Sequence, residues 1–153
     1  MIMSTAYRVF CHSTKGPSAA AFAEHLRHHH PDAVVHFKGD QLGWLRAEVI
    51  LGKHAAPQVI ERFLVEESDM RPQLNSWVAW LETVDHPRRE SVIDRVVNSQ
   101  QVFTLEVHSP DAAKLAKVAC KYLAHMADGI YQIDDEGFFS ADGLLLVPET
   151  RIV

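Results

Sequence analysis

The chain has 153 residues, of which 47% are hydrophobic, 23% charged and 8% aromatic. This composition is typical of one soluble domain with its own core, and it excludes a disordered chain, a collagen-like chain and a disulfide-rich scaffold. Fifteen Lys and Arg stand against twenty Asp and Glu, so the formal charge is -5, which argues against nucleic acid and anionic membranes as partners.

The first third of the chain has the pattern strand, helix, strand, strand. β-Branched and aromatic residues predict the strands, and Ser18 is a suitable N-cap for the helix. The predicted bounds are residues 7–12, 18–30, 33–38 and 44–51. Alternation in the last of these strands predicts one face with Leu45, Ala47, Val49 and Leu51 and an opposite face with Trp44, Arg46, Glu48 and Ile50.

The middle of the chain, about residues 55–98, is predicted to be a helical insert. Pro57 suits the first turn of a helix that runs to about Glu67. Asp69 can cap a second helix, and Pro87 can open a third that runs to Asn98. The apolar stripe of the second helix consists of Leu74, Trp77, Val78 and Leu81.

The last third repeats the pattern of the first. A strand over 101–108 leads into a helix that Ser109 caps, and this helix is predicted to end near residue 127. Strands over 130–133 and 138–147 follow, the second interrupted at 142–143. Both thirds also contain a turn of the form Asp, two residues, Gly and an aromatic, at residues 40–44 and 134–138, and Asp and Gly are residues that tight turns favour.

These elements predict an α+β fold in a single domain spanning residues 1–153. Two βαββ units, at about 7–51 and 101–147, would form one mainly antiparallel sheet of ferredoxin-like character, with the helical insert between them. Helices would cover the apolar face of that sheet.

The two cysteines, Cys11 and Cys120, lie in apolar periodic segments without the spacing of a redox or metal motif. We expect both to be reduced and buried. The first residues show no secretory signal, and no apolar run approaches the length of about 20 residues needed to span a bilayer. A cytoplasmic location is therefore expected.

Alternation in the predicted strands collects polar side chains on the second face of the sheet. The candidate ligand or partner residues on this polar face are His12, His36, Arg46, Glu48, Glu106 and His108. Arg8, Lys38, Thr104 and Gln132 are predicted to lie beside them. Antiparallel sheets commonly leave one polar face to solvent, so the face is either solvated, covered by a partner, or a small-molecule site.

A metal site is the alternative interpretation of the same side chains. It would require histidines and glutamates of this face, such as His12, Glu48 and His108, to meet at bonding distance. No HExxH, phosphate loop, GxSxG or Ser-x-x-Lys motif accompanies them, so no metal and no cofactor are expected under the leading interpretation.

The sequence therefore favours a small cytoplasmic binding or interaction module without catalytic activity. A protein partner, a second copy of the chain or a small molecule would be its ligand, and neither nucleic acid nor membrane is expected. Because the acidic excess lies in residues 57–153, a partner would meet that part with a basic surface. A metal-assisted enzyme acting on a small molecule through the polar face is the alternative.

Overall fold

In the computed structural model, described for residues 4–40, 43–53 and 56–149, eight strands form one sheet. The helices are α1 (Ala19–His29), α2 (Arg71–Glu82), α3 (Arg89–Val97) and α4 (Pro110–Met126), with a short 3-10 turn at Val65–Glu67. The first four strands are β1 (Thr5–Cys11), β2 (Val34–Asp40), β3 (Gly43–Ile50) and β4 (Gln58–Leu64). The last four are β5 (Gln101–Val107), β6 (Gly129–Ile133), β7 (Gly137–Phe139) and β8 (Leu145–Pro148).

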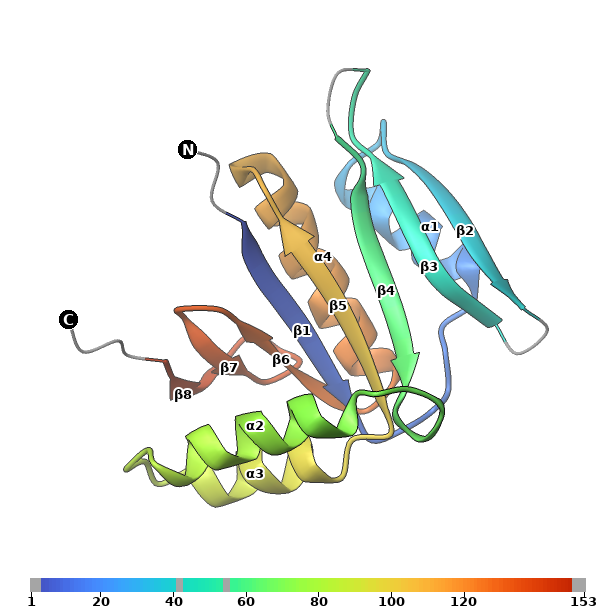
Figure 1. Cartoon of the computed structure of the whole chain (residues 1–153). Coiled ribbons are helices and arrows are strands. Elements are labelled where there is room, and N and C mark those ends of the chain that lie inside the picture. Colours follow the sequence, from blue (N-terminus) through green and yellow to red (C-terminus); the bar gives the residue numbers. More distant parts are fainter. Residues whose placement is uncertain (1–3, 41–42, 54–55, 150–153) are drawn as a thin grey trace.

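The strand order is β2-β3-β4-β5-β1-β6-β7-β8, and each neighbouring pair is antiparallel (Figure 1). The first strand of the chain therefore lies at the centre of the sheet, between β5 and β6. The expected α+β class and the mainly antiparallel sheet are confirmed.

Helices α1 and α4 cover one face of the sheet (Figure 1). Alternate residues of the central strands point to this side, where Val9, Phe103 and Tyr131 are buried with Phe22 of α1 and Leu123 of α4. Period-two alternation in the strands and a single apolar stripe on each helix together produce this larger core.

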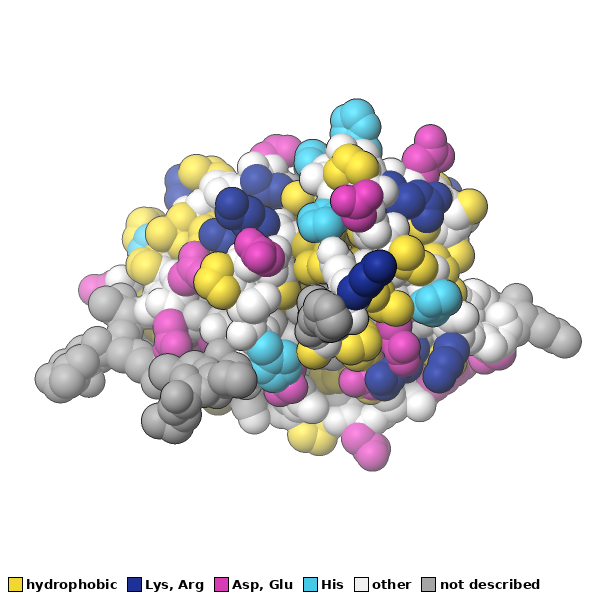
Figure 2. Space-filling model, turned by 90° about the horizontal axis from the view of Figure 1, so that it is seen from above, with side chains coloured by type: hydrophobic (Ala, Val, Ile, Leu, Met, Phe, Trp, Pro, Cys, Tyr) yellow, Lys and Arg dark blue, Asp and Glu magenta, His cyan; other side chains and the backbone are white. Residues whose placement is uncertain are grey.

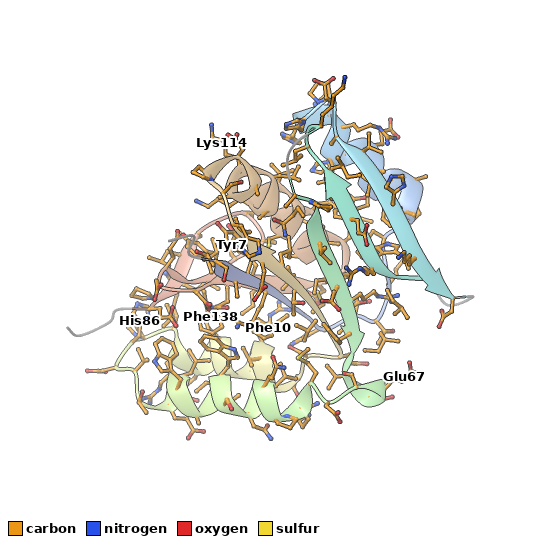
Figure 3. The ribbon with its side chains drawn as sticks, turned by 45° about the horizontal axis from the view of Figure 1, so that its top comes forward. Tyr7, Phe10, Glu67, His86, Lys114 and Phe138 are labelled. Atoms are coloured by element: carbon orange, nitrogen blue, oxygen red, sulfur yellow. The ribbon has the colours of Figure 1, made fainter. Side chains whose placement is uncertain are left out.

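Helices α2 and α3 cover one end of the opposite face, where they pack side by side across the ends of the strands (Figure 1). Phe10 and Phe138 lie between the sheet and this helix pair, with ring centroids 6.0 Å apart (Figure 3). Leu74 and Leu81 of α2 are buried in the same smaller core. We call the rest of this face the open face, and no helix among the described residues covers it.

The predicted helix starts at Ser18 and Ser109 are confirmed. The Ser18 hydroxyl oxygen accepts a hydrogen bond from Ala21 N, and that of Ser109 accepts one from Ala112 N. Each serine thereby satisfies a backbone N–H that the first helical turn leaves without a partner. Cys11 and Cys120 are both free and buried, as expected.

The helix predicted from Pro57 to Glu67 is wrong, because residues 58–64 form strand β4. Gln58, Ile60 and Arg62 are buried on one side of this strand, whereas Glu61 on the other side is exposed. This is the period of a strand, so the expected helical insert at 55–98 is reduced to α2 and α3. The part of the prediction on residues 54–55 lies outside the described residues.

The predicted facing of β3 is wrong at its start. The register between β2 and β3 shifts after Lys38, so Leu45 has no partner on β2. This β-bulge turns Trp44 onto the same side as Ala47 and Val49, where Trp44 is 6% exposed and Leu45 is 40% exposed. Trp44 therefore belongs to the core and not to the polar face.

The two predicted βαββ units have similar element order but different places in the sheet. Helix α1 carries the chain from the centre of the sheet to β2 at the edge, whereas α4 connects β5 to β6, two positions away. The predicted turn chemistry is similar in both units, because Gly43 and Gly137 adopt positive φ angles of 133° and 128°.

Candidate functional site

The open face carries a continuous row of polar side chains that crosses six strands. The backbone register pairs each member with the next, from β2 at the sheet edge to β6 beyond the centre. In spatial order the row is Lys38, Arg46, Glu61, Thr104, Arg8 and Gln132. These side chains share one face because residues in register on antiparallel strands point to the same side of the sheet.

A second row lies beside the first, farther from α2 and α3. On β2, β3 and β4 it consists of His36, Glu48 and Val59, and on β5 and β1 of Glu106 and Ala6. On the other side of the polar row, Phe63, Val102, Phe10 and Ile130 form an apolar row that packs against α2 and α3. The polar face therefore begins where the helix cover ends.

A groove of about 740 Å³ lies between the open face and the first turn of α2. Strands β3, β4, β5 and β1 supply its floor, and residues 68–73 supply one wall. The side chains that line the groove include Arg8, Arg46, Val59, Glu61, Phe63, Ser68, Asp69, Met70, Thr104, Glu106 and His108. Seen from above, basic, acidic and histidine side chains are interspersed over the molecule, without a broad patch of one sign (Figure 2).

Arg8 is fixed at the β6 side of the groove. Its Nη1 donates to Gln132 Oε1 and to Asp134 Oδ1, both at 2.7 Å, and its guanidinium lies 5.1 Å from the centre of the Trp77 ring. Burial alone would raise the pKa of Asp134, but hydrogen bonds from Gln132 and Arg8 and the charge of Arg8 outweigh it, so this pKa is lowered. Arg8 thus has its charge balanced within the chain.

Arg46 is fixed at the opposite side of the groove. Its Nε donates to Glu48 Oε1 at 3.2 Å, and Lys38 Nζ is 4.0 Å from the same oxygen. By contrast, Glu61, Asp69 and Glu106 have no ion pair with any part of the chain that the structure describes. The groove therefore has paired cations at its two sides and unpaired carboxylates between them.

Four of the six candidate residues share the open face, His108 lines the groove beside two of them, and His12 lies apart. His36, Arg46, Glu48 and Glu106 lie on the open face. His12 follows β1 and His108 follows β5, and these strands are antiparallel, with Cys11 opposite Gln101 and Thr5 opposite Val107. His12 and His108 therefore lie at opposite ends of the strand pair.

The metal alternative needed His12, Glu48 and His108 to converge, and the structure does not bring them together. Among the described residues, no three His, Cys, Asp or Glu side chains form a group that could hold a metal ion. His108 lines the groove, whereas the Nε2 atom of His12 is buried without a hydrogen-bond partner at the other end of β1.

Glu61, Asp69 and Met70 belong to the groove but were not among the candidates. The predicted helix from Pro57 to Glu67 removes Glu61 from the sheet, and a local sequence pattern does not show that Asp69 and Met70 fold back over the open face. The sequence of residues 58–63 does not alternate between polar and apolar residues, so the signal that could have found strand β4 is its content of β-branched and aromatic residues, Val59, Ile60 and Phe63.

Comparison of the chain with protein-family models, with curated proteins and with solved structures finds no match. In the ranges that the structure describes, no helix combines the length and the apolar character that crossing a membrane requires.

Proposed function

We propose that this protein is a non-catalytic binding module and that the groove on the open face is its ligand site. The observation that carries the proposal is the groove itself. Its volume of about 740 Å³ lies within the range of roughly 300–1,000 Å³ that small-ligand sites occupy. Four strands form its floor, so its polar groups sit on a rigid element, which favours binding with little loss of entropy.

The chemistry of the lining supports binding rather than covalent catalysis. Ser68 is the serine of the groove lining, and its buried hydroxyl has no hydrogen-bond partner in the structure, so no base is placed to activate it. Burial raises the pKa of the Cys11 and Cys120 thiols, which holds both in the unreactive protonated form. The free state of both thiols also supports a cytoplasmic location as part of the proposal.

The experiment that tests the proposal is a fragment screen followed by NMR. A library of uncharged, cationic and anionic fragments is added to ¹⁵N-labelled protein, and amide shifts are recorded. We expect the hits to shift resonances of β4, β5, β1 and residues 68–73. Hits confined to other surfaces would refute the groove as the ligand site.

A matched pair of variants sharpens this test. Thr104→Trp places a large ring in the middle of the groove floor, so it should abolish the shifts. Lys117→Trp makes a comparable addition on the exposed side of α4, against the opposite face of the sheet, and should leave them unchanged. Equal loss in both variants would contradict the proposal.

A further inference from the structure

We infer that the groove receives an arginine side chain from a partner protein, with its guanidinium held between Glu61 and Glu106. This inference rests on the proposed function, because it requires the groove to be a binding site. It adds the chemical class of the ligand, which the shape of the groove does not determine.

The first argument is the placement of the two carboxylates. Glu61 of β4 lies opposite Thr104 of β5, and Glu106 stands two residues further along β5 on the same face. Diagonal neighbours of this kind have Cα atoms roughly 7–8 Å apart. The two negative charges on these neighbouring side chains repel each other, and a cation between them would turn the repulsion into attraction.

The second argument is that the cations of the chain itself are held elsewhere. Arg46 is the direct cross-strand neighbour of Glu61, yet its Nε donates to Glu48. Arg8 is the direct neighbour of Thr104, yet its Nη1 donates to Gln132 and Asp134. The two arginines that the strand register places beside Glu61 and Thr104 therefore already bind other groups of the chain.

The third argument selects the kind of cation. The guanidinium of arginine offers five N–H donors in a planar fork, so it can bind two separate carboxylates at once, which an ammonium does less well. Val59 and Phe63 of the floor and Met70 of the wall can pack against the aliphatic stem of an arginine. Asp69 adds a third carboxylate to the same groove.

The size of the groove favours a protein segment as the source of the guanidinium. A volume of about 740 Å³ has room for residues on both sides of one arginine, whereas a small free guanidinium compound would leave most of it to water. The acidic excess of the chain beyond residue 56 also favours a protein partner, because it attracts a basic protein surface as the two molecules associate.

The experiment is isothermal titration with capped peptides that carry two arginines between glycines. Peptides with citrulline or glutamate in place of arginine serve as probes that differ in charge. We expect the arginine peptide to bind and to shift the groove resonances. The citrulline peptide should bind more weakly, because citrulline keeps the shape of arginine without its charge. Equal binding of the citrulline or glutamate peptide in the groove would overturn the inference and leave the proposed function standing.

Variants assign the interaction to the two carboxylates. Glu61→Gln and Glu106→Gln should each lower the affinity for the arginine peptide about tenfold, since each removes a charge-assisted hydrogen bond. Glu24→Gln makes the same change on α1, on the other side of the sheet, and should have no effect. Unchanged affinity in both groove variants would overturn the inference.

Two further outcomes separate the remaining possibilities. Agmatine, a small guanidinium compound, should bind more weakly than the peptide, and equal affinity would overturn the assignment to a protein segment. If neither the peptides nor any fragment shifts the groove resonances, the inference and the proposed function both fail.

Discussion

Arg62 is a cation buried inside the sheet, and it donates to three neutral oxygens. Its side chain hydrogen-bonds to Gln101 Oε1, to Trp44 O at 3.2 Å and to Thr14 O at 2.9 Å. The guanidinium thereby joins β4 to β5, to β3 and to the loop after β1. Burial lowers the pKa of Arg62, and the charge of Asp40 opposes this effect.

We predict that Arg62→Ala lowers the free energy of unfolding by about 3 kcal/mol, because it leaves several buried acceptors without donors. Arg62→Lys should recover only part of this loss, since an ammonium cannot reproduce the planar fork. Arg95→Ala is the control: Arg95 forms an exposed pair with Asp128 at 2.9 Å, which contributes less than about 1 kcal/mol. Urea unfolding measures all three, and equal losses would contradict the prediction.

Asp134 gives the protein a dependence on acid that can be measured. Its pKa is lowered in the folded state, so its contribution to stability is present above its unfolded pKa of about 4 and is lost as the pH falls through the lower folded value. Asp134→Asn should therefore cost about 1 kcal/mol at pH 7 and progressively less below pH 4 or so.

Chemical unfolding of wild type and Asp134→Asn between neutral and acidic pH tests this expectation. Asp85→Asn is the control, because Asp85 is exposed and has no hydrogen bond or ion pair in the described residues. A stability difference between wild type and Asp134→Asn that stays constant with pH would refute the role of this carboxylate.

At the scale of elements, helices α1 and α4 were predictable because their signals are local. Ser18 and Ser109 cap helices whose apolar residues recur along one face, and neither signal depends on distant parts of the chain. Strand β4 was not predictable in the same way. Pro57 suggested a helix start, whereas the strand is stabilised by pairing with β3, which precedes it in the chain, and with β5, which follows only after α2 and α3.

The turn between β6 and β7 depends on a glycine. Gly137 has a φ of 128°, and a Cβ atom there would lie 2.8 Å from the Cα atom of Pro148. Gly137→Ala should therefore destabilise the protein by about 2 kcal/mol or more, through backbone strain and overlap with β8.

Gly52→Ala is the matched control for this turn. A Cβ atom at Gly52 would meet nothing within 4 Å, and its φ is not in the left-handed region. Thermal unfolding should show a clear loss for Gly137→Ala and at most a small change for Gly52→Ala. Similar melting temperatures for the two variants would contradict this account of the turn.

At the scale of the whole molecule, two cores share the same strands. Val9 of β1 is buried with α1 and α4, and Phe10 is buried with α2 and α3. The same holds for Phe103 and Val102 of β5. Loss of either core would remove packing from strands that the other core also uses, so we expect one cooperative unfolding transition.

The tryptophans report the two cores separately. Trp44 lies in the larger core, whereas Trp77 and Trp80 pack against the smaller one. The Trp44→Phe variant keeps only the tryptophans of the smaller core, and the double variant Trp77→Phe/Trp80→Phe keeps only that of the larger core. In each variant, the unfolding midpoint by tryptophan fluorescence should equal the midpoint by far-UV circular dichroism. Separate midpoints within either protein would show that the cores unfold independently.

The candidate site was predictable only in part, because the groove depends on how separate segments pack in the whole molecule. Alternation alone placed His36, Arg46, Glu48 and Glu106 on one face, because it is a property of each strand. The groove also needs the wall from residues 68–73 and the position of β4 between β3 and β5, which depend on how distant segments pack. Glu61 was therefore absent from the sequence-based set.

The position of β1 at the centre of the sheet has a consequence for synthesis. Both of its neighbours, β5 and β6, come from beyond residue 100. At a translation rate of about 5–20 residues per second, β1 is made roughly 5–20 s before either neighbour exists. During that interval the nascent chain carries an apolar strand with two unpaired edges, so aggregation threatens the growing polypeptide on the ribosome more than the finished protein.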